Sequence, residues 1–124
     1  MTPFPEIGTT LDCYAGVDYV PTIHDCIKQT SLECGIPVKD ITGRKMSREE
    51  TRARQIAMWA ARKMADKSFP QIARAFNRDH TTAMHAYRLI EDMHNRNYGI
   101  YRVLARGVLC RLGRLRKNDP LMNI

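Results

Sequence analysis

The segment from Asp79 to His85 carries the side chains of this sequence that are best suited to binding chemistry. On a helix that begins at His80, the apolar positions face inward, and short polar groups and imidazoles gather on the outward face near the N-terminus. Carboxylate, imidazole and hydroxyl groups hydrogen-bond to base edges in the major groove, and a threonine methyl packs against a thymine methyl. We therefore predict base contacts from Asp79, His80, Thr81, Thr82 and His85.

A purely structural interpretation is also open, in which Asp79 is an N-cap and the two threonines are first-turn residues. Charge distribution favours binding. Residues 1–43 hold two basic residues against six acidic ones, whereas residues 44–124 hold eighteen against seven, within a formal net charge of +7. The basic excess is mostly arginine, which suits phosphate and guanine. A polyanionic partner, double-stranded DNA, is therefore expected.

Further basic and polar residues are suited to the DNA backbone or the minor groove. Phosphate contacts fix the register of a protein on the duplex without reading sequence, and Ser68, Arg78 and Arg88 are placed for them. The loop residues Arg44, Lys45 and Arg48 are candidates for the minor groove, where arginine meets enhanced negative potential. The alternative for this loop is a solvated connector.

The elements that must position these residues are all predicted to be helices. Capping by Thr22 and the stop signals at Gly35 and Pro37 predict a helix over 22–34, followed by a short helical turn over 37–41. Two capping boxes, Ser47 to Glu50 and Ser68 to Gln71, open the next two helices. The remaining predictions are the long helix 48–66, a two-turn helix ending near 76, a helix over 80–95, and a basic amphipathic helix over 100–115 that Gly107 and Gly113 weaken.

Two short helices joined by three residues have the spacing of a helix-turn-helix. The segments Arg52-Ala53-Arg54-Gln55 and Arg78-Asp79-His80-Thr81-Thr82 also resemble the C-terminal DNA-binding domain of the bacterial initiator DnaA, over residues 20–95. The resemblance implies an all-α domain of five to six helices, similar to the Trp repressor and DnaA C-terminal folds, that binds DnaA-box-like sites. It adds Arg54 and Gln55 to the phosphate contacts. Three positions depart from the family: Asn77 replaces glycines in the turn, Met46 replaces the minor-groove arginine, and Leu89 replaces a basic residue.

These features lead to one main functional expectation and two alternatives. We expect a DNA-binding regulator that is not an enzyme, either a small transcription factor or a competitor for the initiator's boxes, of the kind that a bacteriophage or mobile element encodes. The first alternative is a replication accessory factor that recruits a replication or transcription protein through its C-terminal helix. The second is an interaction module that has lost DNA binding.

The rest of the sequence adds expectations about organisation, cofactors and location. We expect an irregular arm over 1–20, the helix-turn-helix domain over 21–97, and a basic helix and tail over 98–124. The stripe over 100–115 is expected to pack on its own core, with homodimerisation as the alternative. The sequence has no GxxxxGK[ST] motif and no paired metal-ligand spacing at Cys13, Cys26, Cys34 or Cys110, so we expect no nucleotide, cofactor or metal. With no apolar span, cytoplasmic residence on the nucleoid is expected.

Overall fold

The computed structural model describes residues 20–96 and 99–115 of the 124-residue chain. Within these residues every regular element is a helix, which confirms the predicted all-α class. The predicted arm, apart from Val20, and the predicted C-terminal tail from 116 lie outside the described residues. The helices are α2 (Ile23–Cys34), α3 (Val38–Thr42), α4 (Arg48–Met64), α5 (Phe69–Ala75), α6 (His80–Asn95) and α7 (Gly99–Gly113).

The helix boundaries follow from the capping residues. Thr22 at the start of α2 and Ser68 at the start of α5 each complete a capping box, and Gly35 ends α2 in the left-handed conformation with φ 72°. Ser47 accepts a hydrogen bond from the Glu50 backbone N–H, but the return bond of the predicted capping box is not formed. The start of α4 is therefore stabilised by one of the two hydrogen bonds of the predicted capping box.

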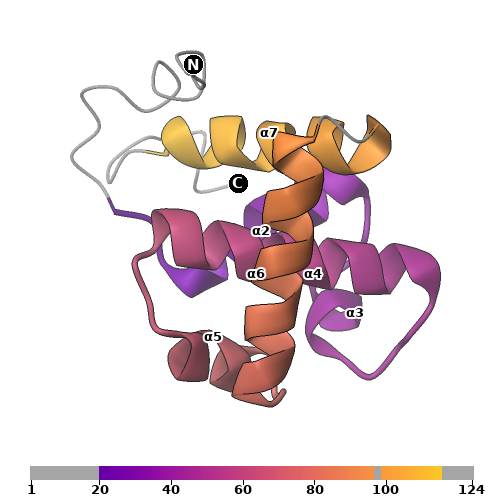
Figure 1. Cartoon of the computed structure of the whole chain (residues 1–124), viewed down its shortest axis with the longest axis vertical. Coiled ribbons are helices and arrows are strands. Elements are labelled where there is room, and N and C mark those ends of the chain that lie inside the picture. Colours follow the sequence, from indigo (N-terminus) through magenta and orange to yellow (C-terminus); the bar gives the residue numbers. More distant parts are fainter. Residues whose placement is uncertain (1–19, 97–98, 116–124) are drawn as a thin grey trace.

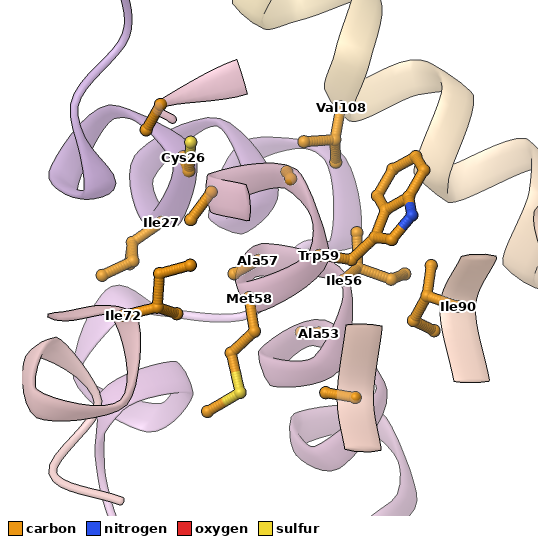
Figure 2. Close-up of a cluster of buried hydrophobic side chains, with 14 of the residues drawn as sticks. Cys26, Ile27, Ala53, Ile56, Ala57, Met58, Trp59, Ile72, Ile90 and Val108 are labelled. Atoms are coloured by element: carbon orange, nitrogen blue, oxygen red, sulfur yellow. The ribbon is translucent and has the colours of Figure 1, made fainter. Parts of the chain in front are cut away.

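Helix α4 lies at the centre of the core. Its buried residues include Ala53, Ile56, Ala57, Met58 and Trp59, and Figure 2 shows side chains from neighbouring helices around them. The surrounding side chains are Cys26 and Ile27 of α2, Ile72 of α5, Ile90 of α6 and Val108 of α7. A fully buried aliphatic side chain of this kind stabilises the fold by about 1.5–3 kcal/mol. The core therefore fixes α5 and α6 relative to α4.

Helix α7 packs against α2, α4 and α6, as predicted for a stripe that covers its own core. Ala105, Val108, Leu109 and Leu112 are buried. Gly107 does not break the helix, and its missing side chain leaves room for Glu33 of α2, whose carboxylate accepts a 2.6 Å hydrogen bond from Arg111 Nε. The predicted stripe is wrong at its beginning, because Ile100 and Val103 are 51% and 61% exposed.

Figure 1 shows α6 running through the length of the molecule, with α5 beside its beginning and α7 beside its end. Helix α3 and the loop that follows it lie toward the α5 end, away from α7 (Figure 1). The molecule thus has one end formed by α5, the start of α6 and the loop after α3.

In the described part of the chain, no helix is long and apolar enough to cross a membrane.

Candidate nucleic-acid interface

The turn between α5 and α6 sets the direction in which the start of α6 points. Asn77 adopts φ 56°, in the left-handed region that asparagine tolerates better than most residues. Phe76 is fully buried, and the Arg78 backbone N–H donates to the Ala73 carbonyl at 2.8 Å. Asparagine therefore supplies the backbone conformation that a glycine would supply, and the departure at position 77 leaves a tight turn intact.

Beyond this turn, α6 presents an exposed polar N-terminus. His80, Thr81, Thr82 and His85 are exposed, and the Asp79 side chain is 73% exposed. Asp79 occupies the N-cap position without a side-chain capping bond. Its carboxylate instead accepts a 2.8 Å hydrogen bond from the Thr81 hydroxyl and lies 3.7 Å from His80 Nδ1. Capping alone therefore does not explain an aspartate here, and its carboxylate remains accessible to a partner.

On the opposite side of α6, the predicted inner stripe is confirmed. Ala83, Ala86 and Ile90 are buried, and Tyr87 and Met93 are partly buried. The rings of Phe69 and Tyr87 pack in an edge-to-face arrangement, with ring centroids 5.8 Å apart. These contacts hold the inner face of α6 against α4 and α5, so its outward face is fixed in orientation.

Arg54 occupies a different place from the one that the sequence suggested. The residue is only 4% exposed, and its guanidinium donates to the carbonyls of Asp40, Ile41, Gly43 and Lys45 at 2.7–3.3 Å. Burial, and after it the positive charge of Arg78, lowers the pKa of Arg54. An arginine still stays protonated at neutral pH. Arg54 is therefore removed from the phosphate contacts and assigned to holding the loop after α3.

Arg78 connects this loop to the helix-turn-helix. Its Nη2 donates to the Gly43 carbonyl at 2.7 Å, so that Arg54 and Arg78 share one acceptor. Its Nη1 donates to the Phe76 carbonyl at 3.2 Å. Arg78 remains partly exposed. The loop and the turn before α6 are thus joined by side-chain hydrogen bonds and form one continuous surface.

The loop itself displays basic side chains. Arg44, Lys45, Met46 and Arg48 are all exposed, and Lys45 forms an ion pair with Asp40 at 3.5 Å. Met46 is 72% exposed. Because the backbone beneath these side chains is held by Arg54, the loop presents them from a fixed position.

A pocket of about 360 Å³ separates the loop from the start of α6. It brings together members of three predicted groups: base contacts, phosphate contacts and the loop. Its walls are Met46, Thr51, Arg54, Gln55, Met58, Arg78, Thr81, Thr82, His85 and Ala86. Thr51 and Met58 were missed from the sequence, although they lie four residues before and three after Gln55, a spacing that places them on one face of α4. The predicted residues Arg44, Lys45, Arg48, Ser68, Asp79, His80 and Arg88 are exposed but do not line the pocket.

His24 and Cys26, two residues apart on α2, are poorly arranged to act as a base and a nucleophile. Cys26 is fully buried, and burial raises the pKa of its thiol to about 12, so it is unsuited to act as a nucleophile. His24, two residues away, is exposed on α2. Among the described residues, no group of His, Cys, Asp and Glu side chains is arranged to hold a metal ion.

Comparison with known proteins agrees with this geometry. A family model described as the bacterial dnaA protein helix-turn-helix matches residues 23–90. The chromosomal replication initiator protein DnaA of Streptococcus mutans is 42% identical over 72 residues, covering 57% of this chain and 16% of that protein. The proteins of the same name from a Ruegeria and a Caulobacter species are 36% identical over 93 residues and 44% over 73. These alignments cover 71% and 58% of this chain but 20% and 15% of the relatives, so the chain spans a fifth or less of their length.

Proposed function

The chain belongs to the bacterial DnaA helix-turn-helix family, and from this premise we propose that it binds double-stranded DNA at a specific sequence. The observation that carries the proposal is the exposed polar N-terminus of α6, joined through Arg78 to a loop of exposed basic residues. A recognition helix inserts its N-terminal residues into the major groove, and neighbouring elements contact the backbone. The proposed interface has both parts.

In this arrangement the start of α6 reads bases. Asp79 accepts from a cytosine amine, and His80 and His85 hydrogen-bond to purine or thymine edges. Thr81 and Thr82 contact bases through hydroxyl and methyl groups. The Asp79–Thr81 hydrogen bond orients the carboxylate before DNA binds, which lowers the entropy lost on association.

The phosphate contacts come from side chains around α6. Gln55 and Arg78 line the pocket, whereas Ser68 and Arg88 are exposed outside it. The proposed minor-groove residues are Arg44, Lys45 and Arg48. Phosphates supply most of the non-specific affinity and make it depend on salt.

Biologically, we propose a small transcription regulator or a competitor for DnaA-box-like sites, without catalytic activity. A second candidate is an accessory factor that binds such sites and recruits a replication or transcription protein through α7. The exposed Ile100 and Val103 on α7 favour this second role, because they are unused by the core. They also fit a homodimer through residues 100–115.

The experiment that tests DNA binding compares a duplex carrying a DnaA box with a scrambled duplex of the same composition across a salt series. We expect tighter binding to the box at moderate salt. Equal, steeply salt-dependent binding contradicts recognition of that box, and selection from random duplexes then seeks another operator. No binding to either duplex, and no selected operator, contradicts the proposed function.

One variant separates phosphate contacts from base contacts in the same experiment. Arg88→Ala is expected to weaken binding to both duplexes alike and to reduce the slope of log affinity against log salt by about one. Arg114→Ala is the control, because this exposed arginine directly follows α7, the helix that lies beside the other end of α6. A loss confined to the box duplex would make Arg88 a base contact instead.

A further inference from the structure

Helix α7 carries an apolar strip on the face that points away from the core. Ile100 and Val103 are 51% and 61% exposed, and they lie three residues apart, so their side chains are neighbours on one face of the helix. Leu104, four residues after Ile100, is partly buried and packs against the core. The strip is thus the outer margin of the stripe that holds α7 to the protein, and more than half of each outer side chain is open to a partner.

Arginines border this strip, and α7 contains no acidic residue. Arg106 follows Val103 by three residues and Arg102 by four, so both side chains lie along one side of the strip, and both are partly exposed. Three acidic side chains on the helices that pack against α7 are already paired with other cations: Glu33 with Arg111, Glu91 with Lys63, and Asp92 with Arg96. Among the described residues, no carboxylate forms an ion pair with Arg102 or Arg106. The border of the strip therefore carries an excess of positive charge.

This surface lies at the end of the molecule opposite the candidate DNA interface. Figure 1 shows α7 beside the end of α6, whereas α5 lies beside its beginning. At about 1.5 Å per residue, the length of α6 puts its two ends roughly 20 Å apart. A partner can therefore be held on α7 while the start of α6 contacts a duplex.

We propose that Ile100, Arg102, Val103 and Arg106 dock an acidic amphipathic helix of a partner protein. Apolar side chains of the partner cover Ile100 and Val103, and its glutamate or aspartate side chains pair with the two arginines. Recognition between helices uses apolar anchors at three- and four-residue spacing, which is the spacing found on α7. The inference rests on the recruiting role proposed for α7 and does not depend on base recognition by α6.

Charge and polarity together select this occupant. A second copy of α7 would place arginines against arginines, and like charges that meet across an interface are unfavourable. A nucleic acid matches the arginines, but its backbone presents phosphates rather than apolar surface to Ile100 and Val103. An acidic amphipathic helix matches both features. Because the anchors are few and the charges lie at the surface, the complex should be weak and sensitive to salt.

The test measures binding of the full-length protein to a labelled synthetic helix by fluorescence anisotropy. The probe has about three heptads, with leucine at the two core positions and glutamate at the flanking positions, and a second probe has lysine in place of every glutamate. Wild-type protein should bind the glutamate probe at least about tenfold more tightly than the lysine probe. Added salt should weaken this binding, and the duplex that the protein prefers should leave it unchanged.

Two variants and a matched control locate the probe on the protein. Val103→Ser should weaken binding to the glutamate probe about tenfold, because an apolar anchor is lost. Arg102→Glu combined with Arg106→Glu should reverse the preference in favour of the lysine probe, a result that loss of folding does not produce. Met46→Ser removes an exposed hydrophobic residue beside basic side chains at the other end of the molecule and should bind as wild type. Unfolding followed by Trp59 fluorescence checks that each variant is folded.

The outcomes separate this inference from the proposed DNA binding. Protein that binds the glutamate probe through α7 but discriminates between no duplexes supports the docking site and contradicts the DNA-binding function. Specific duplex binding without charge-selective binding of the probe overturns the docking site alone. Probe binding that the duplex displaces, or that Met46→Ser abolishes, also overturns it, because the probe would then occupy the DNA interface. Dimerisation in sedimentation that Val103→Ser abolishes would assign the strip to a second copy and overturn it as well.

Discussion

The two ends of α6 have opposite surroundings, although they belong to one continuous helix. At the N-terminal end, His80 and His85 are exposed and face away from the core. At the C-terminal end, Glu91 accepts a 2.8 Å hydrogen bond from Trp59 and pairs with Lys63, and the partly buried His94 ring lies 5.3 Å from the Trp59 ring. One end is left open for a partner and the other is covered by α4 and α7. Binding and stability should therefore respond to different substitutions.

The loop after α3 shares the open end of the molecule but is stabilised differently. The start of α6 is fixed by helical hydrogen bonds and by its inner stripe, whereas the loop carbonyls are bonded to the guanidinium groups of Arg54 and Arg78. A largely buried side chain can thus control the position of the exposed side chains of a loop. Arg54 is the position at which binding and stability should fail together.

The largest effect is expected for Arg54→Met. Removal of the guanidinium leaves loop carbonyls without donors, so the free energy of unfolding should fall by about 3 kcal/mol, and discrimination between duplexes should also fall. Urea unfolding followed by Trp59 fluorescence measures the first and duplex titration the second. The control is Arg52→Met, whose guanidinium lies over the Tyr101 ring and should contribute only about 0.5–1 kcal/mol. Equal losses in the two variants would contradict the assigned role of Arg54.

The next largest effect is expected at the open end, in binding alone. His80→Ala should reduce discrimination between preferred and scrambled duplexes by about 1–3 kcal/mol, because a base contact is lost. Its unfolding free energy should change by less than about 0.5 kcal/mol, since the side chain is exposed. His24→Ala, an exposed histidine on α2, should change neither quantity. Equal weakening on both duplexes would place His80 among the phosphate contacts.

A smaller effect is expected at the turn between α5 and α6. Position 77 has a left-handed backbone conformation with φ 56°, which alanine tolerates poorly. Asn77→Ala should therefore destabilise the protein by about 1 kcal/mol. Asn77→Gly should unfold near the wild-type midpoint, because glycine adopts this conformation freely. Thermal unfolding of the three proteins provides the measurement. If alanine and glycine behaved alike, backbone conformation would not be what selects asparagine here.

Local signals predicted much of this architecture, because capping and periodicity act within a few residues. Three helices were predicted close to their observed limits, two from the capping residues Thr22 and Ser68 and one from the helical period of apolar residues along α6. Arg54 could not be assigned in this way. On the helix it resembles any surface arginine, and its acceptors lie 9 to 14 residues earlier in the chain.

The beginning of α7 also shows what a local pattern cannot predict, because two residues predicted to be buried there are exposed. Ile100 and Val103 match the helical period of the buried stripe, yet both are exposed, since what a periodic residue packs against depends on where α7 crosses α6. At the candidate interface, residue types led to a prediction of which side chains bind, and it stays a prediction. Only the fold shows that Met46 and Thr81 line the same pocket.

The smallest effect is expected at the covered end of α6 and depends on pH. Burial lowers the pKa of His94, the positive charges of Lys63, Arg102 and Arg106 lower it further, and Glu91 opposes them. The folded state therefore favours the neutral ring, and below pH about 6.5 the unfolded chain binds more protons than the folded one. The stabilisation is complete above that pH and is lost as the pH falls toward the lowered pKa.

His94→Gln removes this titration, so its unfolding free energy should fall less steeply than that of the wild type between neutral and mildly acidic pH. Urea unfolding at a series of pH values measures the difference between the two proteins. Duplex discrimination at neutral pH should be unchanged in the variant, because His94 lies on the last turn of α6, far along the helix from His80. Parallel pH profiles would show that the covered end does not favour a neutral ring. Altered discrimination would show that the two ends of α6 are coupled.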